Sequence, residues 1–88
     1  MRIAYECSPP ALIVHIRAAV VQQFAKYQRD YLRAVRIHND AERTKAAEDM
    51  DERRAWLMAE RDAVNRGIRE AGMAPAIQPI NDTLPSLE

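Results

Sequence analysis

Histidine, cysteine and carboxylate side chains are the groups in this sequence whose chemistry could serve catalysis or metal binding. His38 and Glu42 are four residues apart, which would place two ligands on one helical face, but a predicted helix break separates them and no second ligand pair accompanies them. Cys7 is the single cysteine, and the sequence contains no CxxC, no glycine-rich phosphate loop and no recognisable Ser/His/Asp arrangement. We therefore expect no catalytic residues, no metal site and no cofactor, and a protein that is not an enzyme.

Four acidic residues form a cluster early in the second predicted helix: Glu48, Asp49, Asp51 and Glu52. The N-terminal end of a helix carries a partial positive charge, which favours carboxylates at this place without any further role. A carboxylate pair that performs acid–base chemistry would also need a pocket and a perturbed pKa. We interpret the cluster as structural.

A row of basic residues follows helical spacing along the first predicted helix: Lys26, Arg29, Arg33 and Arg36. Steps of three, four and three place these side chains on one face, which we call the basic stripe. Such a stripe could contact the phosphates of nucleic acid or an acidic protein surface, although a solvated helix face is the simpler interpretation. The formal net charge of zero argues against a dedicated nucleic-acid-binding protein.

The first helix is predicted over residues 9–38. Ser8 is suited to cap it, and Pro9 suits the first helical position, where a missing N–H costs nothing. Apolar residues recur in steps of three or four to form a core stripe: Ile13, Ile16, Val20, Phe24, Tyr27, Tyr31 and Val35. A second apolar band lies about 80 to 140° round the helix and consists of Val14, Ala18, Val21, Ala25 and Leu32. One neighbouring helix cannot cover an arc of this width.

The second helix is predicted over residues 40–71. Asn39 can cap its start, and Glu42 can reach back as in a capping box. Gly72 stands where a left-handed residue would end the helix, and Pro75 prevents its continuation. Its apolar stripe is narrower and consists of Ala46, Met50, Leu57, Val64 and Ile68. A chain reversal near residue 40 would pair this stripe with the core stripe of the first helix along the whole length, so the sequence favours an antiparallel helical hairpin over one continuous helix.

The segments outside the hairpin are predicted to be extended. Residues 1–8 alternate between apolar and polar side chains and are interpreted as an N-terminal arm. Residues 73–88 interleave prolines with Ile77, Ile80, Leu84 and Leu87, which suits an extended tail better than a third helix. We expect the isoleucines of this tail to dock on the helices.

Apolar and small residues that the hairpin would leave exposed predict that the protein binds partners. The second band of helix 1 is expected to form the interface of a homodimer, most simply a four-helix bundle. A ridge of small residues recurs every four positions beside Trp56 and consists of Ala55, Ala59, Ala63 and Gly67. It is expected to form an interface, and its spacing leaves open whether the partner is another protein or a second copy of this chain. For this alanine ridge, a plain helix surface beside a half-exposed Trp56 is the competing interpretation.

The amino-acid composition limits which class of protein this can be. With 48% hydrophobic and 30% charged residues, the 88-residue chain suits one folded domain and contains no apolar run of membrane-spanning length. Charge is uneven, because the chain up to Asn39 has six basic and two acidic residues and the remainder has seven and eleven. Glu6 and two prolines interrupt the place where a secretory signal would need an apolar core, so we expect a cytoplasmic protein.

The leading functional hypothesis is a small all-α protein-binding module that, as a homodimer, inhibits or modulates another macromolecule. A phage or mobile-element inhibitor of a host protein is one form of this hypothesis. The alternative is a small nucleic-acid-binding regulator that uses the basic stripe.

Overall fold

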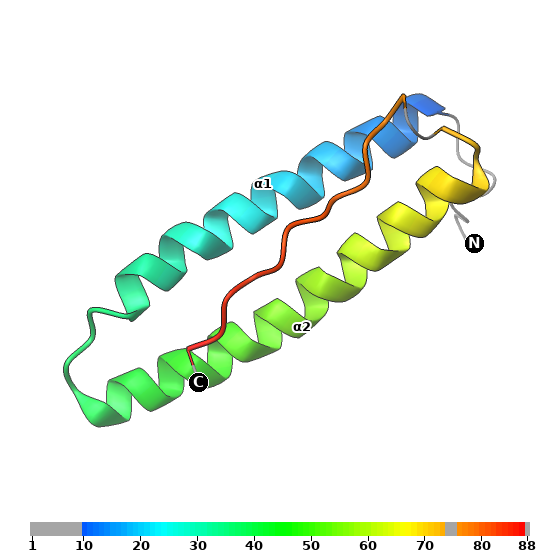
Figure 1. Cartoon of the computed structure of the whole chain (residues 1–88). Helices are drawn as coiled ribbons and strands as arrows, with labels where there is room; N and C mark the ends of the chain where they lie inside the picture. Colours follow the sequence, from blue (N-terminus) through cyan, green and yellow to red (C-terminus); the bar gives the residue numbers. More distant parts are fainter. Residues whose placement is uncertain (1–9, 74–75, 88) are drawn as a thin grey trace.

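The computed structural model describes residues 10–73 and 76–87, and its regular elements are two α-helices joined by a short loop. Helix α1 spans Pro10–Ala34 and helix α2 spans Asp40–Glu70. They pack side by side as an antiparallel hairpin of 47 × 29 × 17 Å, and the C-terminal segment runs between them (Figure 1). The predicted all-α hairpin is confirmed, whereas the predicted arm 1–8 and the Ser8 cap lie outside the described residues.

Helix α2 begins and ends where its capping residues predict. Asn39 has extended backbone angles, and its side-chain oxygen accepts a hydrogen bond from the Glu42 N–H at 2.9 Å. At the other end, Gly72 has a φ of 67°, which places Met73 N–H within 3.1 Å of the Ile68 carbonyl. These are the features of a Schellman motif, in which glycine adopts the left-handed conformation without steric cost.

Helix α1 ends four residues earlier than predicted. After Ala34 the chain tightens into a turn, with the Ile37 N–H bonded to the Ala34 carbonyl at 3.1 Å. The chain must reverse its direction before Asn39 caps α2, and residues 35–38 form this connection instead of a last turn of α1. Val35 consequently leaves the core stripe and is exposed, and Ala34 takes the buried position in its place.

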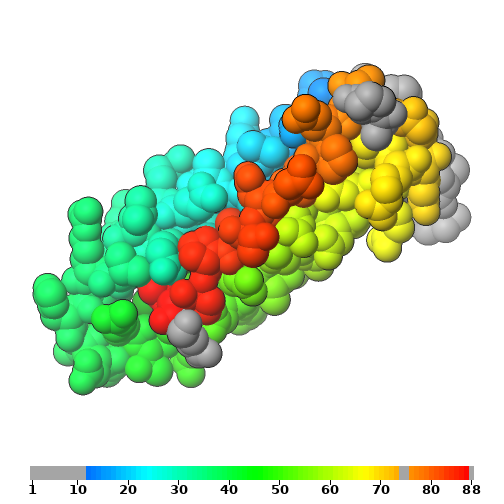
Figure 2. Space-filling model, in the orientation of Figure 1, coloured from blue at the N-terminus to red at the C-terminus, as the bar shows by residue number. Residues whose placement is uncertain are grey.

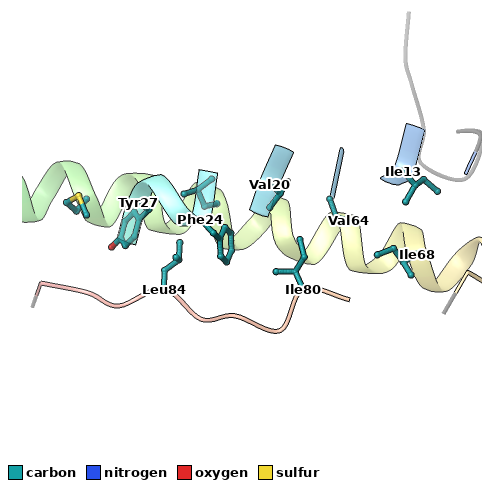
Figure 3. Packing of buried hydrophobic residues seen from close by; sticks show 10 residues of the cluster. Ile13, Val20, Phe24, Tyr27, Val64, Ile68, Ile80 and Leu84 are labelled. Atoms are coloured by element: carbon teal, nitrogen blue, oxygen red, sulfur yellow. The ribbon is translucent and has the colours of Figure 1, made fainter. Parts of the chain in front are cut away.

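The core lies along the seam between the two helices. Its buried members are Ile13, Val20, Phe24, Tyr27, Met50, Leu57, Val64, Ile68, Ile80 and Leu84. Eight of these belong to the predicted helix stripes, as expected when antiparallel stripes face each other in register. Ile80 and Leu84 come from the tail, and in Figure 3 their side chains point from the tail toward the helices.

The tail is the third layer of the core. Residues 76–87 have no regular secondary structure and fill one groove of the hairpin, as Figure 2 shows in orange and red. Ile80 and Leu84 are buried, and Ile77 and Leu87 pack against the core as partly buried residues. The tail thus supplies apolar cover that two helices alone would lack on this side.

Side chains from both helices hold the backbone of the tail. Arg17 on α1 donates to the Gln78 carbonyl at 2.7 Å, and Arg54 on α2 donates to the Leu84 carbonyl at the same distance. Arg61 donates to the Asp82 carbonyl at 2.9 Å. An extended segment has no internal hydrogen bonds, so these side chains satisfy backbone carbonyls that would otherwise depend on water.

Tyr27 joins α1 to the end of the tail. Its ring is fully buried, its hydroxyl donates to the Pro85 carbonyl at 2.5 Å, and the Arg53 guanidinium lies 5.5 Å from the ring centroid. Burial is the main cause that raises the pKa of Tyr27, so the phenol stays neutral and able to donate at neutral pH. The stability that this shift contributes is present below the ordinary tyrosine pKa and is lost as the pH rises through the higher, folded-state pKa.

Asn65 is the most specific anchor of the tail. Its side-chain amide donates to the Ile80 carbonyl at 2.8 Å, and its side-chain oxygen accepts from the Ile80 N–H at 2.8 Å. Asn65→Ala should lower the free energy of unfolding by about 1–3 kcal/mol, because both hydrogen bonds of a partly buried site are lost. Urea titration followed by circular dichroism measures the change. Asn81→Ala removes the same amide from an exposed tail residue and is the control; equal effects of the two substitutions would contradict the anchoring role.

Candidate protein interface

Trp56 stands on the side of α2 that faces away from the tail. The α2 residues that hold the tail are Asp51, Arg54, Arg61 and Asn65. At 3.6 residues per turn, the mean direction of these four side chains is about 180° from that of Trp56 around the helix axis. The indole is 67% exposed, the largest exposed fraction among the large hydrophobic side chains described. The groove of the hairpin that the tail leaves open therefore carries this aromatic ring.

A shallow hollow of about 450 Å³ lies beside Trp56. Its lining residues come from both helices and are Gln23, Asp49, Glu52, Arg53, Trp56 and Leu57. Leu57 belongs to the buried core, and the remaining residues of the lining are polar or aromatic. We call this hollow together with Trp56, Ala55 and Ala59 the Trp56 surface.

The charge of the hollow is negative at its α2 edge. Arg53 donates to the Asp30 carboxylate at 3.0 Å, so its positive charge is matched by an acidic partner on α1. Asp49 and Glu52 have no ion-pair partner in the part of the chain that the structure describes. A partly exposed pair such as Arg53–Asp30 adds little to stability, but it sets the position of the guanidinium at the hollow.

The alanine ridge is only partly available to a partner. Ala55 and Ala59 are exposed, Ala63 is half-buried and Gly67 is buried. The ridge therefore turns into the protein toward its C-terminal end, because a stripe repeating every four residues drifts slowly round a helix of 3.6 residues per turn. Of the predicted interface residues, Trp56, Ala55 and Ala59 form one continuous exposed surface.

The predicted dimer-interface residues of α1 remain uncovered. Val14, Val21 and Leu32 are 46%, 37% and 59% exposed, Ala18 is exposed and Ala25 is half-buried. The tail does not reach this band, because it lies between α1 and α2. Exposed large apolar residues that repeat along one face of a helix are typical of an interface rather than of scattered surface positions.

The basic stripe is exposed along its whole length. Lys26, Arg29, Arg33 and Arg36 make no ion pair within residues 10–73 and 76–87, where the ion pairs are Arg53–Asp30 and Arg61–Asp62. Unpaired cations in a row remain free to meet an anionic partner.

Among the described residues, no group of three or more His, Cys, Asp or Glu side chains could hold a metal ion. No helix of this part of the chain has the length and apolar character needed to cross a bilayer. Comparison with protein-family models, curated proteins and solved structures found no match.

Sequence reasoning missed Gln23 and the Arg53–Asp30 pair as parts of the Trp56 surface. Gln23 and Asp30 lie on the flank of α1, seven residues apart, and approach the hollow only because the two helices pack in a particular register. The signal that could have found them is the antiparallel register itself, which brings Asp30 close to Arg53 across the hairpin.

Proposed function

We propose that this chain is a small non-enzymatic protein-binding module that works as a homodimer and uses the Trp56 surface to inhibit or modulate another protein. The observation that carries the proposal is the 67% exposed Trp56 beside a hollow, on the side of the hairpin that the tail leaves open. Tryptophan is enriched among the residues that dominate binding energy at protein interfaces.

The chemistry of the Trp56 surface favours a partner with an apolar or aromatic anchor and neighbouring basic residues. The anchor would fill the hollow against Trp56 and Leu57 and displace water from apolar surface. Basic residues of the partner would meet the carboxylates of Asp49 and Glu52, which have no ion-pair partner in the described chain. Small side chains at Ala55 and Ala59 would let a partner helix approach α2 closely.

Affinity capture from the native cells tests this function. Trp56→Ala should weaken capture of the partner by about 30-fold or more, because loss of a central aromatic anchor costs at least 2 kcal/mol. His38→Ala, an exposed substitution in the interhelical loop, is the control and should leave capture unchanged. The captured proteins are identified by mass spectrometry, and equal capture by wild type and Trp56→Ala would contradict the proposal.

A nucleic-acid-binding regulator is the second candidate, supported by the four exposed and unpaired cations of the basic stripe. The same capture experiment distinguishes it. Under this alternative, capture would survive Trp56→Ala, would disappear after nuclease treatment, and would be lost in the Arg29→Glu/Arg33→Glu variant. Its strength would also fall steeply with salt concentration, as counterion release requires.

A further inference from the structure

The exposed band of α1 is longer and more regular than its predicted apolar members suggest, and it includes one polar residue. With Gln28 and Val35 included, its positions advance by alternating steps of four and three: Val14, Ala18, Val21, Ala25, Gln28, Leu32 and Val35. This is the spacing of the two core positions in a coiled-coil heptad. Within α1 the band runs from Val14 to Leu32, about 27 Å at 1.5 Å per residue, and Val35 follows in the turn after the helix end. We call it the α1 seam.

The surroundings of the α1 seam leave room for one further helix. On one side Arg17 reaches to the Gln78 carbonyl and thereby marks the border of the tail. On the other side Arg29 and Arg36 of the basic stripe are exposed. All members of the α1 seam except Ala25 are exposed, so the hairpin's own packing leaves them uncovered.

We infer that a second copy of this chain covers the α1 seam, with its α1 antiparallel to the first. In this arrangement Val14 packs against Leu32 of the second copy, Ala18 against Gln28, and Val21 against Ala25. The two-fold axis generates each pairing twice, so the same residues of both copies form the interface and the assembly stops at a dimer. The inference rests on the proposed homodimer and specifies its geometry.

Side-chain size favours the antiparallel orientation. Each antiparallel pairing contains at least one side chain larger than alanine, so no layer of the interface is filled by alanine alone. A parallel pair would instead place Ala18 against Ala18 and Ala25 against Ala25 of the second copy. Those layers would be underfilled next to layers of valine and leucine, and interiors tolerate such voids poorly.

Charge favours the same orientation. In a parallel pair the two basic stripes would lie at the same end of the dimer. In the antiparallel pair, their centres are about 24 Å apart along the axis at 1.5 Å per residue, beyond the Debye length of about 8 Å at physiological salt. Arg29 then lies between the levels of His15 and Gln22 of the second copy, so no arginine or lysine faces another across this border of the seam.

Disulfide mapping tests the orientation. The chain with Cys7→Ser, Val14→Cys and Leu32→Cys is equilibrated in glutathione redox buffer, and its disulfides are identified by mass spectrometry after trypsin digestion. A disulfide within one chain is impossible, because positions 14 and 32 of one helix are about 27 Å apart and a disulfide needs Cα atoms within about 7 Å. Trypsin separates the two sites into the fragments 3–17 and 30–33.

The antiparallel dimer predicts a covalent dimer in which fragment 3–17 is linked to fragment 30–33. Chains with Cys7→Ser and only Val14→Cys or only Leu32→Cys should remain unlinked, because identical positions are then about 27 Å apart. Links between identical fragments would overturn the orientation. An absence of links, together with a monomeric mass of the wild type in sedimentation equilibrium, would overturn the α1 seam as a self-interface.

The cross-linking experiment tests the dimer independently of partner binding at the Trp56 surface. Trp56 lies on α2 in the groove that the tail leaves open, whereas the α1 seam lies on α1 beyond the tail. Addition of Trp56→Ala to the cysteine variant should therefore leave the cross-link unchanged. Failure of the cross-link with retained, Trp56-dependent capture would reject the dimer alone, and the reverse result would reject the binding function alone.

Discussion

Ile80→Ala/Leu84→Ala is expected to remove most of the stability of the folded chain. Both side chains are buried, with exposed fractions of 4% and 1%, and they are the members of the core that the tail supplies. Truncation of a buried isoleucine or leucine to alanine costs about 2–5 kcal/mol. Two such losses approach the 5–15 kcal/mol that a small domain has in total. The free energy of unfolding from guanidinium titration is the measurement.

Two further variants keep this prediction testable when the double variant does not fold. Ile80→Val removes one methyl group and should cost about 0.5–1.5 kcal/mol, which is measurable in a folded protein. Thr83→Ala changes an exposed residue between the two buried ones and should be nearly neutral. If Ile80→Ala/Leu84→Ala unfolded at the same guanidinium concentration as Thr83→Ala, the tail would not belong to the core.

Leu32→Glu is expected to dissociate the homodimer without unfolding the hairpin. Leu32 is 59% exposed within one chain, so a carboxylate at this position meets water in the monomer. In the dimer it would be buried against Val14 of the second copy, and the two-fold axis would repeat the penalty. A cost of about 3 kcal/mol or more corresponds to a dissociation constant raised by at least about 100-fold.

Sedimentation equilibrium across a concentration series measures this dissociation, and circular dichroism reports whether the helices persist. Thr44→Glu adds the same negative charge at an exposed position of α2, away from the α1 seam, and should leave the dissociation constant nearly unchanged. A Leu32→Glu chain that associates as tightly as Thr44→Glu would show that the α1 seam is not the self-interface.

The sequence predicts the hairpin well because local signals determine it. The apolar stripes repeat with helical spacing, and stripes that match in length also set the register. Asn39 and Gly72 define the start and the end of α2 by local capping. The end of α1 was predicted wrongly because Val35 continues the apolar spacing. The connection that reverses the chain before the Asn39 cap takes up residues 35–38 and outweighs this periodicity.

The positions of the tail and of the hollow were not predictable in detail. Prolines and isoleucines in the tail indicate an extended apolar segment, but no periodicity shows which groove it fills. That choice depends on long-range contacts, such as the paired hydrogen bonds between Asn65 and Ile80. The tail also determines which groove of the hairpin stays open. The exposure of Trp56 beside a hollow therefore follows from the tertiary structure. The sequence shows only that Trp56 lies off the core stripe.

Trp56 allows a direct measurement of the central claim, because it is the single tryptophan of the chain. Its fluorescence therefore reports on the Trp56 surface alone. The protein captured in the affinity experiment is prepared in a form without tryptophan fluorescence and titrated into the wild-type chain, while acrylamide quenching is followed. We predict a blue-shifted emission and strong protection from quenching on binding, since the partner would cover the indole. Binding that leaves both emission and quenching unchanged would contradict the claim that this surface binds the partner.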